Sequence, residues 1–495
     1  MKAVQLAVLS LLFLISSSFI TLKWQYPFYF NCTPNILEQV FPDQNACRLY
    51  NEIPHELKFL SYAIYPLSKG YDTARFNFNK RFNIFPHAIF TPRDEEEVVY
   101  VLSILKKHHL PFSIRSGGHC IEPGSLSSGY VIDLRNFNKI TPNFECQEAF
   151  IGAGCLLGSV IETLGRCGYA IPTGSCTSVG IAGQALGGGI GILDRPFGLT
   201  CDLVKSILMI DAEGRLLTIN KKSHPDLFWA LRGGGNGSYG IVLGFTSKTQ
   251  FVPIVTYDKS SWDWGPTIVQ EVFDRFQEWI VTLPDSISSS LEMEYRDHQL
   301  MFYIDGLKVG PEEFTEWKSA FASLNPKVTT KRETYLESTR FWTDRDPFPF
   351  LKYKSEMLFE LLTEAPVQLA IDFFEKIKKE KRSWLVSFAL GALGGKVADK
   401  HTAFFPRKAF AWWHQKIFWD KQKQDAAALA KLSEFYEAIT PYVSPFAYAN
   451  LVDYELGSGY LEAYYGDNVD ELIRIKNKYD PKNLFRWRQS IPLHR

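Results

Sequence analysis

The residues best suited to hold a charged ligand lie in a glycine-rich stretch between Gly152 and Gly240. A pyrophosphate needs several backbone N–H donors that converge without side chains in the way, so phosphate-binding loops are rich in glycine. The run 172–189, PTGSCTSVGIAGQALGGG, could supply such donors. It lacks the strand, helix and acidic residue of a dinucleotide-binding fingerprint and the Lys-Ser/Thr ending of a P-loop. From the residues alone it indicates an anion or cofactor loop, with tight structural turns as the alternative.

The composition argues against a metal site and against nucleic-acid binding. The eight cysteines form no CxxC pair, so we expect no zinc site and no other metal centre. Cys32 and Cys47 could close a small disulfide loop if the chain is exported. The 54 basic residues balance the 54 acidic ones, and no basic run is long enough to follow a phosphate backbone. Nucleic acid is therefore not an expected partner.

The surrounding sequence predicts helices and strands in both halves of the chain. Asp94 can cap a helix, with Glu97 three residues on, and apolar residues then recur at helical spacing. Glycine is sparse from about 255 to 435, where alternating patterns predict an antiparallel sheet covered by helices on one side. At 495 residues we expect two domains. The predicted elements are strands at 110–114, 130–134 and 384–390, a hairpin at 291–304 turning at Asp297-His298, and a helix at 424–439.

The N-terminus is typical of an exported protein. Lys2 precedes an uncharged stretch from Ala3 to Leu22, and Lys23 closes it. A short basic start, a Leu-rich run and a small-residue patch indicate a signal peptide within residues 1–24. The stretch also has about the 20 residues needed to cross a bilayer, so an uncleaved membrane anchor is the alternative. Either version places the catalytic part outside the cytosol, in a secreted, periplasmic or membrane-anchored protein.

Ordered motifs along the chain resemble those of the berberine-bridge-enzyme-like family of FAD-linked oxidases. They begin with Arg115-Ser-Gly-Gly-His119 and Gly174-Ser-Cys176-Thr-Ser-Val-Gly180, and they extend from about residue 85 to the C-terminus. The further matches are Leu186-Gly-Gly-Gly189, Gly198-Leu-Thr-Cys-Asp202, His224-Pro-Asp-Leu-Phe-Trp229, Leu231-Arg-Gly-Gly-Gly-Asn-Gly-Ser-Tyr-Gly-Ile-Val242, Tyr464-Tyr-Gly-Asp-Asn468 and Lys478-Tyr-Asp-Pro-Lys-Asn-Leu-Phe485.

The resemblance implies an α+β, two-domain flavoprotein of the vanillyl-alcohol-oxidase type. A PCMH-type FAD domain would occupy 85–253, a substrate domain with an antiparallel sheet 255–435, and a C-terminal segment, 440–495, would complete the FAD domain. In many members a histidine binds the 8α-methyl group of the flavin and a cysteine binds C6, and His119 and Cys176 stand at the matching positions. A neutral imidazole and a thiolate suit those two electrophilic positions. Bicovalent FAD is therefore the implied cofactor.

The resemblance also implies which residues contact FAD. Cys120 follows the linking His119 directly, and its side chain should point away from that of its neighbour. The implied cofactor-binding residues are Arg115, Ser116, Gly117, Gly118, His119, Cys120, Gly174, Ser175, Cys176, Val179, Gly180, Gly183, Gly187, Gly188, Gly240, Ile241, Val242 and Asn483.

Two departures from the family pattern affect the catalytic base. Family members often carry Tyr two residues after the linking His, where this chain has Ile121. They often carry a Tyr-x-Asn-Tyr-x-Asp motif whose second Tyr helps to deprotonate the substrate, where this chain has Leu451. An alkyl group cannot replace a hydroxyl that hydrogen-bonds a substrate proton. Tyr448, Asp453 and Tyr454 are the remaining candidates, with a structural role as the alternative for each.

The leading functional hypothesis is an oxidase that transfers hydride from a small alcohol or carbohydrate to the flavin, with oxygen as acceptor. A dehydrogenase that passes electrons to a quinone or another carrier is the second hypothesis, and a flavin-binding protein without turnover is the third. In the family, Val three residues after the linking Cys accompanies oxidases and Leu accompanies dehydrogenases; here that residue is Val179. The substrate itself is not identified by any motif.

Overall fold

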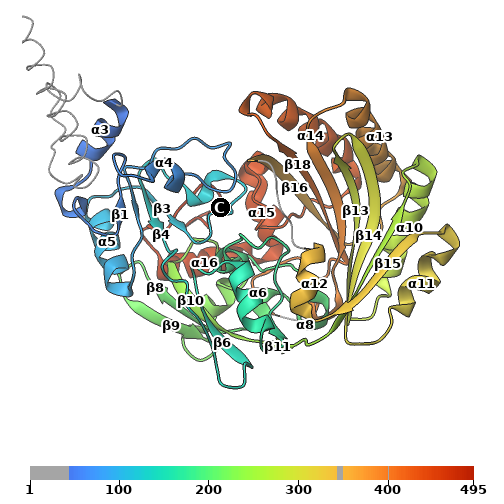
Figure 1. Ribbon diagram of the computed structural model, residues 1–495. Helices are drawn as coiled ribbons and strands as arrows, with labels where there is room; N and C mark the ends of the chain where they lie inside the picture. The colour runs from blue at the N-terminus through green and yellow to red at the C-terminus, as the bar shows by residue number, and fades with distance from the viewer. Residues whose placement is uncertain (1–43, 343–348, 400) are drawn as a thin grey trace, which may run out of the picture.

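The computed structural model describes residues 44–342, 349–399 and 401–495, and these form two lobes (Figure 1). The predicted signal peptide or anchor, and Cys32, lie outside the described residues. Within the described ranges no helix is long and apolar enough to cross a membrane.

The first lobe begins with a four-stranded mixed sheet, in the order β1-β2-β4-β3. Its strands are β1 (Ala63–Ile64), β2 (Ala88–Phe90), β3 (Phe112–Arg115) and β4 (Tyr130–Asp133). Helix α5 (Glu95–Lys107) confirms the prediction at Asp94, whose side chain accepts a hydrogen bond from the Glu97 amide. Glu97 in turn accepts from the Arg93 amide, one residue before the expected position. Three helices lie near this sheet or precede it: α3 (Gln44–Asn51), the 3₁₀ helix η2 (His55–Leu57) and α4 (Tyr71–Ala74).

A five-stranded antiparallel sheet, in the order β5-β6-β10-β8-β9, completes the first lobe. Its largest core joins this sheet to the helices that flank it. The strands are β5 (Ile140–Pro142), β6 (Glu148–Gly152), β8 (Val204–Ile210), β9 (Leu216–Asn220) and β10 (Ile241–Lys248), and β7 (Tyr169–Ala170) pairs separately with β11 (Gln250–Phe251). The helices are η3 (Pro123–Ser125), α6 (Leu157–Gly165), α7 (Ile181–Leu186), α8 (Asp194–Phe197), η4 (Thr200–Asp202) and α9 (Pro225–Ala230).

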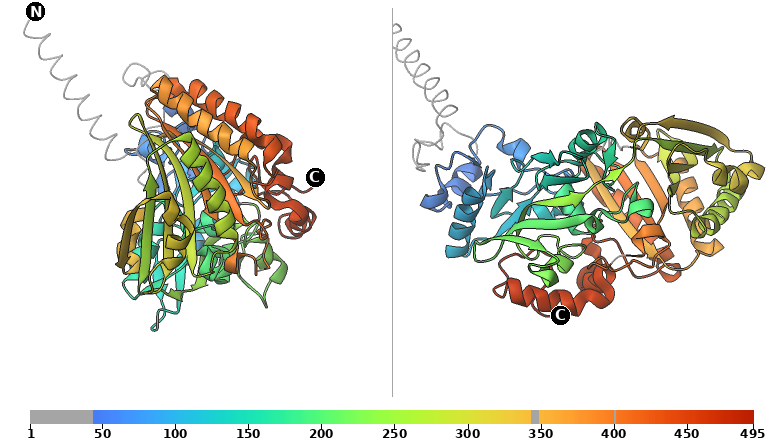
Figure 2. Two further views of the ribbon diagram at one scale, coloured as in Figure 1. Left: turned by 90° about the vertical axis from the view of Figure 1, so that its right-hand side faces the viewer. Right: turned by 90° about the horizontal axis from the view of Figure 1, so that it is seen from below.

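The second lobe is a seven-stranded antiparallel sheet, in the order β15-β12-β14-β13-β17-β18-β16. Three long helices cover one face, and the other face is turned toward the first lobe (Figures 1 and 2). The strands are β12 (Val255–Trp262), β13 (Ile287–Arg296), β14 (Gln299–Val309), β15 (Lys327–Glu333), β16 (Phe350–Leu358), β17 (Leu385–Ala392) and β18 (Ala411–Trp419). The helices are α10 (Pro266–Val281), α11 (Thr315–Phe321), η5 (Ala322–Leu324), α12 (Tyr335–Trp342), α13 (Glu364–Glu380), η6 (Gly395–Val397), η7 (Gln422–Gln424), α14 (Asp425–Ile439) and η8 (Thr440–Tyr442).

The sheet confirms the sequence predictions for this region. The hairpin turns at Asp297 and His298, whose φ angles of 50° and 64° are the left-handed pair that a two-residue hairpin loop requires. The predicted strand at 384–390 is β17, and the predicted helix at 424–439 is α14. An α+β fold with a helix-covered antiparallel sheet is therefore confirmed.

The C-terminal segment packs back against the first lobe, where its helices lie beside the strands of that lobe in Figure 2. The ammonium group of Lys476 is buried and donates hydrogen bonds, each 2.6 Å long, to the carbonyls of Ser238 and Phe485 and to the Asp480 carboxylate. One side chain thus joins the segment to the glycine-rich loop before β10. The helices here are η9 (Tyr454–Gly459), α15 (Tyr460–Tyr465), η10 (Gly466–Asn468) and α16 (Val469–Tyr479).

Candidate active site: the cavity between the lobes

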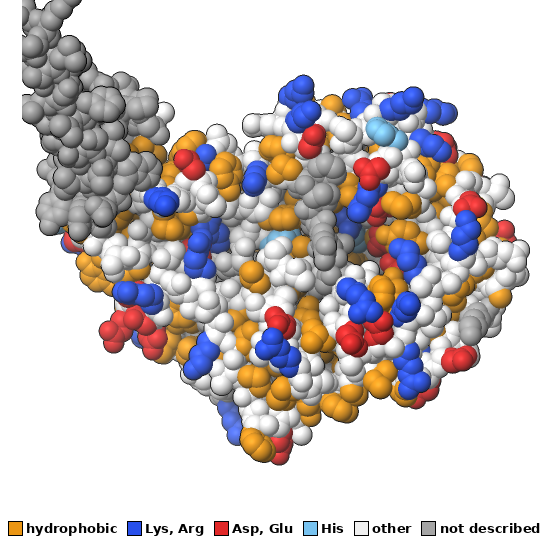
Figure 3. All heavy atoms as spheres, viewed as in Figure 1, with side chains coloured by type: hydrophobic (Ala, Val, Ile, Leu, Met, Phe, Trp, Pro, Cys, Tyr) orange, Lys and Arg blue, Asp and Glu red, His pale blue; other side chains and the backbone are white. Residues whose placement is uncertain are grey.

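A cavity of about 910 Å³ lies between the glycine-rich loops of the first lobe and the uncovered face of the seven-stranded sheet. The face on which the cleft opens carries positive and negative side chains interspersed with apolar ones (Figure 3). The cavity is large enough for an extended cofactor and a small substrate together.

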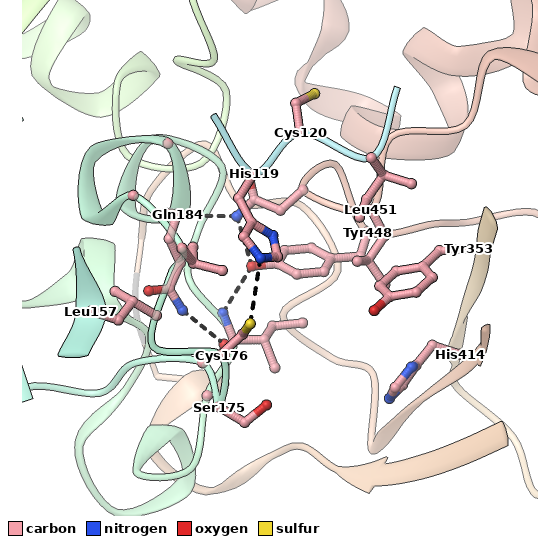
Figure 4. Close-up of a pocket in the computed structure, with 18 of the residues that line it drawn as sticks. His119, Cys120, Leu157, Ser175, Cys176, Gln184, Tyr353, His414, Tyr448 and Leu451 are labelled. Atoms are coloured by element: carbon pink, nitrogen blue, oxygen red, sulfur yellow. Dashed lines mark hydrogen bonds between the residues drawn. The ribbon is translucent and has the colours of Figure 1, made fainter. Parts of the chain in front are cut away.

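His119 and Cys176 meet at the first-lobe side of this cavity, although 57 residues separate them. His119 follows the turn after β3, and Cys176 lies in the loop before α7. The Cys176 Sγ is 3.4 Å from the His119 Nε2, and the His119 ring is stacked on Phe78 with centroids 3.7 Å apart (Figure 4). Two nucleophilic atoms therefore face the same end of one cavity, as attachment to two positions of one benzenoid ring requires.

Two glycines bring these loops together. A Cβ built on Gly117 would overlap the backbone nitrogen of Gly180, and a Cβ on Gly180 would overlap that of Gly117. The loops therefore touch backbone to backbone, and any side chain at either position would separate His119 from Cys176. Gly183 differs, because its missing Cβ would meet no atom within 4 Å and would project into the cavity.

The polar lining of the cavity suits a ligand with hydrogen-bond donors. Gln184 lines it and donates from Nε2 to the Ile190 carbonyl, 3.3 Å away. Its Oε1 is buried and accepts no hydrogen bond from the residues that the structure describes. The open backbone at Gly183 and the unpaired Gln184 Oε1 fit the polar ring of a flavin. His119 and Cys176, across the loop, fit its edge.

Most of the predicted cofactor-binding residues line the cavity. The Cys120 thiol is turned away from His119 (Figure 4), and burial, only partly offset by backbone amide hydrogen bonds, raises its pKa to about 11. A thiol held protonated in this way is a poor competitor for flavin attachment. The predicted residues on the cavity wall are Ser116, Gly117, Gly118, His119, Cys120, Gly174, Ser175, Cys176, Val179, Gly180, Gly183, Gly240 and Val242.

Five predicted cofactor-binding residues do not line the cavity. Arg115 is buried and donates from Nε to Asp133, 2.7 Å away, which ties β3 to β4. Gly187 and Gly188 pack against the side chains of Asn450 and Phe404, so they permit close packing behind the wall. The two others are Ile241, in the core beneath the wall, and Asn483, in the turn after α16.

Of the three catalytic candidates predicted from the sequence, one lines the cavity and two do not. Tyr448 lines the cavity, but its hydroxyl accepts hydrogen bonds from the amides of Gly189 and Ile190 and from the side chain of Asn450. Burial outweighs these bonds and raises its pKa to about 12, so the phenol anchors the glycine turn rather than accepting a proton. Asp453 and Tyr454 are not on the cavity wall.

Asp453 belongs to a buried ion cluster behind β16. Lys352 Nζ lies 2.7 Å from Glu122 and 2.5 Å from Asp453, and all three side chains are nearly inaccessible to solvent. Lys354 lies 2.8 Å from Asp453. Burial opposes ionisation of Asp453, but the two ammonium groups outweigh it and hold the pKa of Asp453 below its usual value. The members of the ion cluster are Arg81, Glu122, Lys352, Lys354, Asp453 and Glu455.

The ion cluster fixes three parts of the site relative to one another. Glu122 lies three residues after His119, Lys352 is next to Tyr353 on β16, and Asp453 lies two residues after Leu451. A single ammonium thus joins the turn that carries His119, the second-lobe strand and the C-terminal segment.

The opposite wall carries the residues that sequence reasoning missed. His414 and Tyr353 come from β18 and β16 and face the space in front of His119 and Cys176 (Figure 4). The His414 ring is stacked on Trp412, 4.3 Å between centroids, and its buried Nδ1 has no hydrogen-bond partner among the described residues. Burial, with the nearby Lys416, holds the pKa of His414 well below its usual value. The imidazole is therefore neutral.

The two departures from the family pattern lie together beside this wall. Ile121 and Leu451 both line the cavity and pack in one apolar cluster with Phe418, Leu385 and the ring of Tyr353. These two positions therefore form a single apolar patch. The polar side chains on the facing wall come from the second-lobe sheet.

The remaining part of the second-lobe wall is strongly polar. Charged side chains of both signs project from neighbouring strands, and the Arg296 Nε lies 2.7 Å from Glu294. Tyr257 donates to Asp305 over 2.5 Å. The charged residues of this wall are Lys259, Glu292, Glu294, Arg296, Asp305 and Lys416.

Comparisons with known proteins agree with this arrangement. The family model described as FAD binding domain matches residues 86–220, and the one described as Berberine and berberine like matches residues 447–492. The uncharacterized FAD-linked oxidoreductase YgaK of Bacillus subtilis is 33% identical over 435 residues, 85% of this chain and 94% of that protein. Reticuline oxidase of Eschscholzia californica is 28% identical over 455 residues, 82% of this chain and 83% of that protein. The structure of Physcomitrella patens BBE-like 1 has a TM-score of 0.79 at 26% identity and covers 88% of this chain and 97% of that one.

Proposed function

Because the chain belongs to the berberine-bridge-enzyme-like family of FAD-linked oxidoreductases, we propose that it oxidises a small, polar alcohol or carbohydrate on FAD attached through His119 and Cys176. The observation that carries this proposal is the 3.4 Å approach of the Cys176 Sγ to the His119 Nε2, with the neutral His414 on the facing wall. The FAD-binding part would comprise 85–253 and 440–495, and the substrate-binding part 255–435.

The first lobe would hold the cofactor. His119 and Cys176 would attach one edge of the ring system, while Gly183 and the Gln184 Oε1 leave space and an acceptor for its polar part. When bound, FAD supplies the two-electron chemistry, accepting hydride from a substrate carbon and passing the electrons to an acceptor. The protein contributes orientation and exclusion of water.

The second lobe would bind the substrate and accept its proton. His414 is the proposed proton acceptor, because its neutral ring lines the cavity on the wall that faces His119 and Cys176. Trp412 fixes the plane of the imidazole by stacking. The charged wall from Lys259 to Lys416 supports a substrate with several hydroxyl groups, because an apolar molecule would cover these groups without replacing their hydration.

Oxygen is the proposed acceptor. Val179 is half-buried on the cavity wall in the loop that carries Cys176, and its small side chain leaves more room for oxygen than leucine would. A glycine-to-alanine variant of berberine bridge enzyme is described as a reticuline dehydrogenase, which agrees with the idea that a small change in bulk can decide the acceptor. A dehydrogenase that uses a quinone or another carrier is the second candidate.

Denaturation tests the cofactor proposal. Acid precipitation should leave FAD on the wild-type protein, and His119→Ala combined with Cys176→Ala should release it. Each single variant should keep the flavin through the other bond, which gives a matched pair of controls. Complete loss of flavin from precipitated wild-type protein would contradict covalent attachment. Bleaching of the flavin by a panel of sugars and alcohols would identify the substrate, and peroxide release would distinguish the two acceptors.

We further propose export of the catalytic part, supported by the uncharged stretch from Ala3 to Leu22 between two lysines. The mature protein should begin at about residues 19–26 or remain bound to a membrane. N-terminal sequencing of the protein from its native cells decides this, and a cytosolic protein with Met1 intact would refute both versions.

A further inference from the structure

Two cysteines far from the cavity lie together on the surface of the first lobe. Cys146 is in the loop between β5 and β6, and Cys167 is in the turn between α6 and β7. Cys146 is half-buried and Cys167 is exposed. Neither residue contributes to the proposed reaction, and nothing in their spacing along the chain predicts that they meet.

The two loops are adjacent because both are anchored to the same short segment, residues 249–252. The Thr249 amide donates to the carbonyl of Gln147 over 2.9 Å, and its hydroxyl donates to the carbonyl of Cys146. Three residues on, the Val252 amide donates to the carbonyl of Gly168 over 2.8 Å. The pairing of β11 with β7 fixes the direction of the second loop.

The side chains agree with this juxtaposition of the loops. Interaction with the Cys167 thiol, together with burial, raises the pKa of the Cys146 thiol. Two other cysteines, Cys155 and Cys201, are buried singly and are shielded from oxidants.

From this geometry we propose that Cys146 and Cys167 form a disulfide bond in the mature protein. Each thiol loses its S–H bond, one S–S bond forms, and two protons and two electrons leave. A protein disulfide of an export-compartment thiol oxidoreductase would accept the electrons and become a dithiol. The bond would close the segment 146–167, which contains β6 and α6.

The bond would also support the flavin-attachment loop. At the start of α6, the amides of Leu157 and Gly158 donate to the carbonyls of Val179 and Thr177, each over 2.9 Å. Cys167 follows the other end of the same helix. Fixing Cys167 to the β5–β6 loop would therefore restrain a helix whose first turn is hydrogen-bonded to the loop that carries Cys176.

Peptide mapping of the full-length holoprotein tests the proposal. The protein is equilibrated in a glutathione buffer mixed to the redox poise of a secretory compartment, then denatured in iodoacetamide without reductant. Cleavage after Glu, Lys and Arg separates Cys146, in the tripeptide 146–148, from Cys155, and it places Cys167 at the start of another peptide. We expect the tripeptide to be linked to the peptide that begins at Cys167, with two hydrogens lost. Because this peptide also contains Cys176, fragmentation of the linked pair should place the bond at Cys167.

The variants Cys146→Ser and Cys167→Ser should each abolish the link and expose the other cysteine to alkylation. Reductant should lower the melting temperature of the wild-type protein by more than that of the double variant. Full alkylation of Cys146 and Cys167 in the equilibrated wild-type protein would overturn the proposal. Because the buffer sets the redox poise, this result is independent of whether the proposed export is correct.

Discussion

Replacement of Lys352 by methionine tests whether the ion cluster holds the site together. Lys352→Met keeps the length of the side chain and removes its ammonium group, which is 2% exposed and lies 2.7 Å from Glu122 and 2.5 Å from Asp453. These carboxylates are 3% and 6% exposed, so water cannot replace the lost partner. Breaking a buried ion pair by removing one partner costs about 3–5 kcal/mol of unfolding free energy.

The neighbouring charges place the expected cost at the lower end of that range. Asp453 keeps Lys354 at 2.8 Å, and Glu122 keeps Arg81 at 3.4 Å. We therefore expect Lys352→Met to cost about 3 kcal/mol at pH 7. The pH matters because Asp453 has a lowered pKa in the folded protein. Its contribution is complete above the unfolded pKa of about 3.9 and is lost as the pH falls through the lower folded value.

The matched control is Lys376→Met, the same chemical change in a surface pair. Lys376 and Glu434 are 52% and 62% exposed, so this variant should change stability far less than Lys352→Met does. Urea unfolding, followed by tryptophan fluorescence, compares both variants with the wild type. A difference between the two variants below about 1 kcal/mol would refute the reasoning that the ion cluster is a buried, mutually dependent unit. In the same samples the flavin absorbance should change to that of the unfolded protein at lower urea in Lys352→Met, because Glu122 holds the turn after His119.

Three further predictions concern single side chains. His414→Gln should slow substrate-dependent flavin reduction by about 10²–10⁴-fold, the usual contribution of a proton acceptor, with flavin content unchanged. Stopped-flow absorbance measures the rate of flavin reduction, and a loss of less than tenfold would show that His414 is not the proton acceptor. Val179→Leu should slow reoxidation of the dithionite-reduced flavin by oxygen without releasing FAD, because one added methylene fills space on the cavity wall. Equal, slow reoxidation rates in the wild type and the variant would favour the dehydrogenase. Burial raises the pKa of Glu356 from 4.5 to about 8, so the folded protein retains a proton that the unfolded chain releases, and stability should fall as the pH rises through that window. Glu356→Gln should match the wild type in urea midpoint near pH 4.5 and exceed it near pH 8, whereas parallel pH curves would contradict this assignment.

The sequence predicted those features that depend on residues close together in the chain. The α5 helix follows from the Asp94 cap and helical spacing, and the β13–β14 hairpin follows from strand alternation around Asp297-His298. The motifs around His119 and Cys176 identified the family because close backbone approach requires glycine at fixed positions, as at Gly117 and Gly180. These steric requirements are local, so they can be recognised from the order of residues in the sequence.

The identity of the groups on the second-lobe wall depended on the tertiary structure. Alternation along β18 indicates that His414 lies on the face opposite Trp413, but it does not say which face meets the core and which meets a cavity. The tertiary structure decides this, because α10, α13 and α14 cover one face of the sheet and the other face lines the cavity opposite the first lobe. For the same reason Asp453 was predicted near the chemistry and instead lies in the ion cluster, since its partners, Lys352 and Lys354, are about a hundred residues away.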